Sequence, residues 1–151
     1  MKINNDKMIT EGEIYRFLQK VDDKFPIPLS KKQDLKCFSK KLFEKATVVV
    51  KHENEEIVAM VAGYTENIVD NIAYITILAT LECARGKGYA KRIIEDFFEI
   101  CKSKKIKAVH LYAAPSNIPA VNLYKKIGFV QYKIENEPRK EDLHLIYYFD
   151  K

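Results

Sequence analysis

A turn rich in glycine and positive charge, Arg85-Gly-Lys-Gly-Tyr-Ala90, is the segment whose residues best suit a chemical task. Its two glycines let the backbone turn tightly and approach a ligand with no Cβ in the way. A helical pattern follows from Gly88 to about Lys104, so the free N–H groups and the dipole of the first helical turn would attract an anion. The turn therefore predicts a site for phosphate, and in particular for pyrophosphate. The residues expected to form this site are Arg85, Gly86, Lys87, Gly88, Tyr89, Ala90 and Lys91.

Two common phosphate motifs do not describe this turn. A P-loop needs a lysine followed by Ser or Thr, whose hydroxyl binds magnesium, and no hydroxyl follows Lys87. A dinucleotide fingerprint needs a third glycine where this chain has Lys91, and it opens the first β-α-β unit, whereas this turn lies past the middle of the chain. Both motifs are therefore disfavoured.

A second segment, Asn117-Ile-Pro-Ala-Val-Asn-Leu-Tyr124-Lys-Lys-Ile-Gly128-Phe129, follows the turn. Together with the pattern Arg-x-x-Gly-x-Ala of the turn, it resembles the GCN5-related N-acetyltransferase (GNAT) superfamily. The resemblance runs from about Ala46 to Phe129 and is weaker on either side. Each motif alone is modest evidence, but the two in this order form a specific signal.

The resemblance implies transfer of an acetyl group from acetyl-CoA to a primary amine. The glycine turn would bind the pyrophosphate of CoA, and Asn117 would contact CoA. The backbone of Leu78, Ala79 and Thr80 would hold the pantetheine arm and the acetyl group. Tyr124 would protonate the leaving thiolate, a step that suits a phenol with a pKa of about 10. For the arm to enter, the strand expected over 72–81 would have to splay away from the strand expected over 108–113.

Each of these roles has a simpler alternative. Tyr124 could be an aromatic residue that packs its helix on the sheet, and Asn117 could be an ordinary N-cap. The base that deprotonates the amine is poorly specified. Glu82, at the end of the acetyl-holding strand, is the best placed carboxylate, although a solvated loop glutamate is the alternative. A non-catalytic module that binds acyl-CoA or docks to a partner on the same fold also stays open.

The acceptor is either a small-molecule amine or a protein amine. By resemblance, Phe25–Leu29 and Ile134–Asp142 frame its pocket, in the parts of the chain that match the family least. Polyamines, aminoglycosides, amino sugars, amino acids and protein N-termini all remain open as acceptors. A homodimer is compatible with the resemblance, because dimers are common among relatives.

The hydrophobic pattern predicts an α/β fold in which a mixed sheet of about six strands carries flanking helices. Thr10 and Glu13 form one capping box and Ser30 and Gln33 a second, each opening a helix. The expected strands are 47–51, 57–64, 72–81, 108–113, 130–135 and 143–149. Residues 1–9 make a poor strand, so the strand with which the family usually begins is expected to be missing.

The length and charge of the chain limit which classes of protein it can belong to. The 151 residues suit one domain over 1–151, and no apolar run is long enough to span a membrane. The net charge of +5 is moderate and comes without a nucleic-acid motif, so we expect no nucleic-acid partner and no membrane partner. The cysteines show no metal spacing, so no metal is expected. They suit free thiols, and no secretory signal is evident in the sequence. We therefore expect the protein in the cytoplasm. The three cysteines are Cys37, Cys83 and Cys101.

Overall fold

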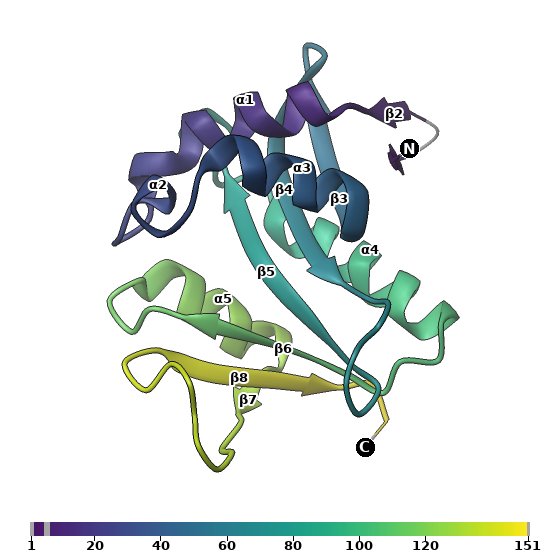
Figure 1. The fold of residues 1–151 in the computed structure, drawn as a ribbon, viewed down its shortest axis with the longest axis vertical. Helices are drawn as coiled ribbons and strands as arrows, with labels where there is room; N and C mark the ends of the chain where they lie inside the picture. The colour runs from purple at the N-terminus through teal and green to yellow at the C-terminus, as the bar shows by residue number, and fades with distance from the viewer. Residues whose placement is uncertain (1, 5–6, 151) are drawn as a thin grey trace.

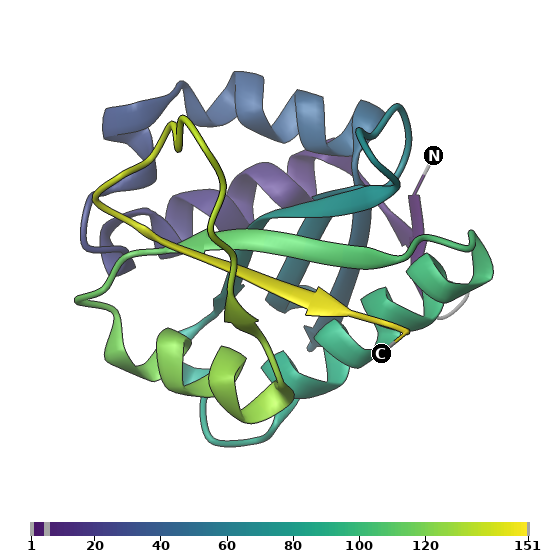
Figure 2. The same cartoon turned by 90° about the horizontal axis from the view of Figure 1, so that it is seen from below.

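The computed structural model describes the backbone of residues 2–4 and 7–150 and the side chains of residues 8–150. A six-stranded sheet forms the middle layer, with α1 and α3 on one face and α4 and α5 on the other (Figures 1 and 2). The strands of this sheet are β3 (Thr47–Glu53), β4 (Glu56–Tyr64), β5 (Ile72–Thr80), β6 (Ala108–Ala113), β7 (Val130–Gln131) and β8 (Leu143–Tyr148). The helices are α1 (Glu11–Val21), α2 (Leu29–Lys32), α3 (Leu35–Lys45), α4 (Tyr89–Ser103) and α5 (Ile118–Ile127), with short 3₁₀ turns η1 (Asp22–Lys24) and η2 (Glu82–Ala84).

The sheet is mixed, with the strand order β3-β4-β5-β6-β8-β7. Strand β5 pairs with β6 in parallel, and the other described neighbours in the sheet pair antiparallel. Helix α4 connects the two parallel strands, as the sequence predicts for a β-α-β unit. The predicted α/β class with a sheet of about six strands is therefore confirmed.

The two parallel strands separate soon after they meet. Residues Ile72–Tyr74 of β5 pair with Ala108–His110 of β6, and the pairing goes no further although both strands continue. Figure 1 shows them diverging from their shared end. On its other side, β5 stays paired with β4, and the register shifts at Ala62 and Gly63 so that Thr76 is an extra residue on β5. This bulge bends β5 away from β6, and the splay expected from the sequence is present.

A separate hydrophobic core fills each face of the sheet. Helix α4 turns Ile93, Ile94, Phe97 and Cys101 onto one face, the stripe that its 3.6-residue period predicts. On the other face, Phe17 and Leu18 of α1 pack with Phe38 and Leu42 of α3. Because both faces are covered, the central strands carry apolar residues on both sides.

The start of the chain departs from the expected pattern in two ways. Strands β1 (Lys2–Asn4) and β2 (Lys7–Ile9) form a small sheet of their own, so the six-stranded sheet begins at β3; residues 1, 5 and 6 lie outside the described part. The second predicted capping box is wrong. Ser30 lies inside the short helix α2, which ends at Lys32. Helix α3 begins at Leu35, because the Asp34 carboxylate accepts a hydrogen bond from the Lys36 N–H at 2.9 Å and caps α3.

Gly63, opposite the bulge, is the glycine on which the packing of this region depends most. A Cβ at this position would lie 2.6 Å from the Tyr74 carbonyl oxygen and 2.7 Å from Cζ of the buried Phe97. We therefore expect Gly63→Ala to lower the free energy of unfolding by about 2 kcal/mol, measured by urea denaturation.

The matched control is Gly12→Ala in α1. A Cβ there would meet its nearest neighbour at 3.7 Å, so the change should raise the free energy of unfolding by about 0.5 kcal/mol through helix propensity. If Gly63→Ala were as stable as the unchanged protein, the close approach at the bulge would be refuted.

Candidate active site

A cavity of about 330 Å³ lies where β5 and β6 separate. Its walls come from β5, β6, α5 with the segment that leads into it, α2 with the connection before it, and the β7–β8 loop. The residues that line it from α2, the connection before α2 and the β7–β8 loop are Phe25, Pro26, Ile27, Leu29, Lys32, Arg139, Glu141 and Asp142. Both segments expected to frame an acceptor pocket therefore contribute to this one cavity.

Three of the predicted site residues line the cavity: Leu78, Asn117 and Tyr124. Asn117 precedes α5 and makes no side-chain capping bond, so the N-cap alternative does not account for its amide. Tyr124 lies on the buried face of α5, where its ring packs edge-on against Phe129 at 5.5 Å between centroids. Burial raises the pKa of the Tyr124 phenol, which keeps it protonated at neutral pH.

The glycine turn has the geometry of an anion site but lies outside the cavity lining. Gly86 and Gly88 have φ angles of 79° and 78°, a left-handed conformation that favours glycine. Gly88 is the N-cap of α4, and the first backbone bond of the helix runs from the Arg92 N–H to the Gly88 carbonyl at 3.2 Å. The N–H groups of Tyr89, Ala90 and Lys91 precede that bond and point out of the helix end.

A carboxylate that the sequence analysis did not single out binds this turn. Glu53, at the end of β3, pairs with the Lys87 ammonium at 3.0 Å and accepts a hydrogen bond from the Tyr89 hydroxyl. Hydrogen bonds from Tyr89 and Lys87 lower the pKa of Glu53. Lys51 lies 5.3 Å from the Tyr89 ring centroid. No local sequence pattern links Glu53 to the turn, because 34 residues separate Glu53 from Lys87.

The remaining predicted residues lie nearby but do not line the cavity. Ala79 and Thr80 end β5 and pair with Met60 and Ala59 of β4. Beyond Tyr74, the opposite edge of β5 has no strand partner in the described chain, so its backbone groups face the gap. Glu82 is exposed, with 76% of its side-chain surface accessible, and its carboxylate lies 3.5 Å from the Lys24 ammonium.

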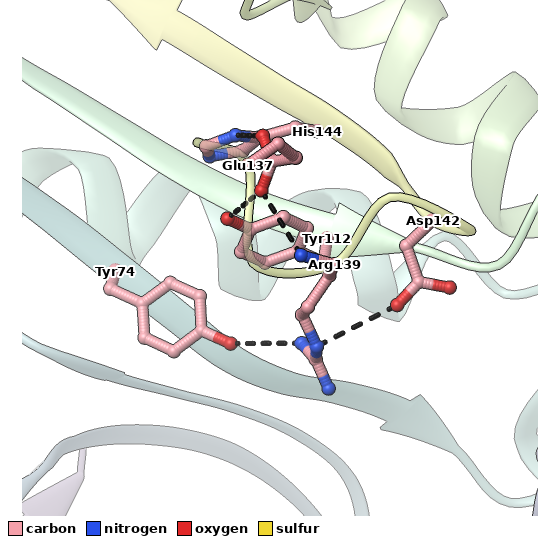
Figure 3. Close-up of polar contacts among 6 residues, drawn as sticks. All are labelled: Tyr74, Tyr112, Glu137, Arg139, Asp142 and His144. Atoms are coloured by element: carbon pink, nitrogen blue, oxygen red, sulfur yellow. Dashed lines mark hydrogen bonds and ion pairs between the residues drawn. The ribbon is translucent and has the colours of Figure 1, made fainter. Parts of the chain in front are cut away.

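A row of polar side chains in contact with one another links the β7–β8 loop to β6 and β8 (Figure 3). The Tyr112 hydroxyl donates to Glu137, whose other oxygen lies 2.7 Å from Nδ1 of the buried His144. Nε2 of His144 lies 2.7 Å from Nδ1 of His110. Burial alone would raise the pKa of Glu137, but the hydrogen bonds from Tyr112 and His144 outweigh it and hold that pKa below its usual value. These contacts fix the β7–β8 loop to the sheet.

The comparisons with known proteins identify the family. The sequence pattern described as "Acetyltransferase (GNAT) family" matches residues 14–129, which is more than half of the chain. The chain belongs to the acetyltransferase (GNAT) family. None of the curated proteins compared with the chain matches it in sequence.

Solved structures of GNAT acetyltransferases share its fold. A GNAT acetyltransferase from Staphylococcus aureus Mu50 superposes with a TM-score of 0.76 at 15% identity, covering 93% of each chain. The PaiA N-acetyltransferase of Thermoplasma acidophilum, solved with coenzyme A, gives 0.66 at 14% identity and covers 91% of this chain and 89% of that one. Arabidopsis thaliana Naa50, solved with the bisubstrate analogue CoA-Ac-MVNAL, gives 0.69 at 19% identity, with coverages of 93% and 95%. At these identities the likeness establishes the fold.

The described part of this GNAT chain shows neither a metal-binding cluster nor a membrane-spanning helix. No described group of three or more His, Cys, Asp or Glu side chains could hold a metal ion. Within the same residues, no helix is both long and apolar enough to cross a membrane.

His110 makes the stability of this GNAT protein depend on pH. Burial, with a smaller effect of His144, lowers the pKa of His110 from its usual 6.5 to about 4. The unfolded chain therefore binds a proton at this site near pH 6.5, whereas the folded protein binds it only near pH 4. Because the unfolded state binds more protons in between, stability should fall as the pH drops from about 6.5 to 4.

The variant His110→Asn tests this dependence. Its amide can occupy the position of Nδ1 but does not titrate, so unfolding between pH 6.5 and 4 should take up about one proton fewer than in the unchanged protein. Urea denaturation at half-unit pH steps would measure this difference. An identical slope in both proteins would exclude His110 as the source.

Proposed function

We propose that the protein is an acetyl-CoA-dependent N-acetyltransferase that acts on a primary amine. The observation that carries the proposal is the separation of β5 from β6, which opens a cavity lined by Leu78, Asn117 and Tyr124. The glycine turn at the start of α4 follows β5 after the short 3₁₀ turn η2. This arrangement suits a donor whose phosphates lie at a helix N-terminus and whose thioester lies between two strands.

The donor would be held mainly by backbone groups. The left-handed Gly86 and Gly88 leave room for a pyrophosphate beside the N–H groups of Tyr89, Ala90 and Lys91. The unpartnered edge of β5 between Leu78 and Thr80 offers N–H and C=O groups to the amide groups of a pantetheine arm. The side chains of Arg85 and Lys91 add positive charge at the same end.

The reaction would be a direct attack. The nitrogen of the neutral amine forms a bond to the thioester carbonyl carbon, and the C–S bond then breaks. The thiolate would leave with the proton of the Tyr124 hydroxyl, while the amine gives up a proton to a base. Burial keeps the phenol protonated at neutral pH, so its proton is in place when negative charge develops on the sulfur as the C–S bond breaks.

The acceptor would enter from the side of the cavity formed by Phe25–Leu29 and the β7–β8 loop. Glu82 remains our proposed base. It would act through water, because its exposed carboxylate does not line the cavity. The relatives solved with coenzyme A and with a bisubstrate analogue support a donor of this class on the same fold.

Tyr124→Phe tests the proposed acid. The variant keeps the ring that packs against Phe129 but lacks the proton, so turnover should fall roughly a hundredfold while the affinity for acetyl-CoA stays nearly unchanged. Thiol release across a panel of amines gives the turnover, and calorimetry gives the affinity. Unchanged turnover would remove Tyr124 from the mechanism. CoA binding by the unchanged protein without turnover of any amine would favour a non-catalytic module.

Gly88→Ala tests the phosphate site. No atom lies within 4 Å of the position of the added Cβ, so the penalty comes from the left-handed backbone alone. If the turn relaxes, its N–H groups move, and we expect CoA to bind roughly tenfold more weakly. Gly12→Ala, outside the site, is the control. Full CoA affinity in Gly88→Ala would argue against the turn as the donor site.

A further inference from the structure

Arg139 places a guanidinium group in the wall of the cavity. It belongs to the β7–β8 loop, in the part of the chain that resembles the family least, and it has no role in the proposed chemistry. The other charged groups that line the cavity are Lys32, Glu141 and Asp142. The cavity wall therefore holds two cations and two carboxylates.

Three contacts hold the guanidinium of Arg139 in place (Figure 3). Its Nη1 donates to the Tyr74 hydroxyl on β5 at 3.3 Å, and its Nε lies 3.7 Å from an Asp142 carboxylate oxygen. Its Cζ lies 5.0 Å from the ring centroid of Tyr112 on β6. The group is thus positioned by two strands and by its own loop.

These contacts leave part of the group without a partner. A guanidinium has five N–H donors, and the described contacts engage Nη1 and Nε. Of the Arg139 side chain, 38% remains exposed. Among the described contacts none engages Nη2, and Arg139 lines the cavity.

The loop that carries Arg139 is itself anchored. Two residues earlier, Glu137 accepts hydrogen bonds from Tyr112 and from the backbone N–H of Arg139, the latter at 3.4 Å, and pairs with the buried His144. A ligand would therefore meet a cation already in position and would lose less conformational entropy in binding it.

We propose that the amine acceptor carries an anionic group, a carboxylate or a phosphate, which Arg139 binds while the amine points toward Tyr124. This inference rests on the proposed acetyl transfer. Guanidinium groups bind both anions through paired N–H donors. Asp142 is already beside Arg139, so the cavity lacks the excess of carboxylates that a polycationic acceptor requires, and the net charge of +5 favours an anion.

The test compares matched acceptors that differ only in the anion. The pairs are β-alanine with β-alaninamide, dipeptides with their C-terminal amides, and phosphorylated amino sugars or phosphoethanolamine with their unphosphorylated forms. We expect kcat/KM to be at least roughly tenfold higher for the anionic member of the accepted pair, as a charge-assisted contact provides. The carboxylate pairs and the phosphate pairs separate the two sources of the anion.

Arg139→Gln should abolish this preference while leaving kcat/KM for the neutral member, and the affinity for CoA, within about threefold. Arg16→Gln, the same change on exposed α1 outside the cavity, is the matched control and should keep the preference. Equal turnover of both members, or a best acceptor that is neutral or polycationic, would overturn the inference and leave acetyl transfer intact.

A second readout does not depend on turnover. With CoA saturating, the NMR signal of the Arg139 Nε–H, assigned by its loss in Arg139→Gln, should shift on titration with the anionic amines and not with their neutral partners. If no amine in any pair is acetylated and this signal does not move, the inference is wrong. If the unchanged protein did not bind CoA, that result would instead refute the proposed function.

Discussion

The early separation of β5 from β6 is the constraint on which the rest of this structure depends. Two parallel strands that pair over three residues and then diverge leave strand edges whose N–H and C=O groups need another partner. β5 stays paired with β4 from Tyr74 to Thr80 on its other side, apart from the bulge, and α4 and α5 pack into one core on the sheet. The same divergence places Tyr124 of α5 and the connection after α1 on one cavity.

The bulge at Thr76 and the absence of a side chain at Gly63 make this divergence possible. The bulge bends β5, and Gly63 of β4 lets the Tyr74 carbonyl of β5 and the ring of Phe97 come close at the place where a Cβ would lie. The active-site gap and the hydrophobic core are therefore coupled, because a change in the packing around Phe97 would alter the path of the strand that lines the cavity.

The sequence predicted those parts that depend on local pattern. Helix α4 and its buried stripe follow from a 3.6-residue period, and the turn before it follows from two glycines. The second capping box was wrong because Asp34, four residues after Ser30, offers a stronger cap for α3, a competition that periodicity does not resolve. The contacts made by Glu53, Glu137 and Arg139 could not be predicted, because each joins residues that are distant in the chain.

The pairing of Glu53 with Lys87 and Tyr89 affects which residues of this turn could change during evolution. With these two side chains engaged, an anion at the turn would be left chiefly with main-chain donors, which every residue except proline supplies. The lysines could then be replaced without abolishing anion binding, whereas the left-handed positions Gly86 and Gly88 would favour glycine. In sequence, such a turn would be recognised only by its glycines, with variable residues between them. The side chains around it could then contribute to stability rather than to ligand recognition.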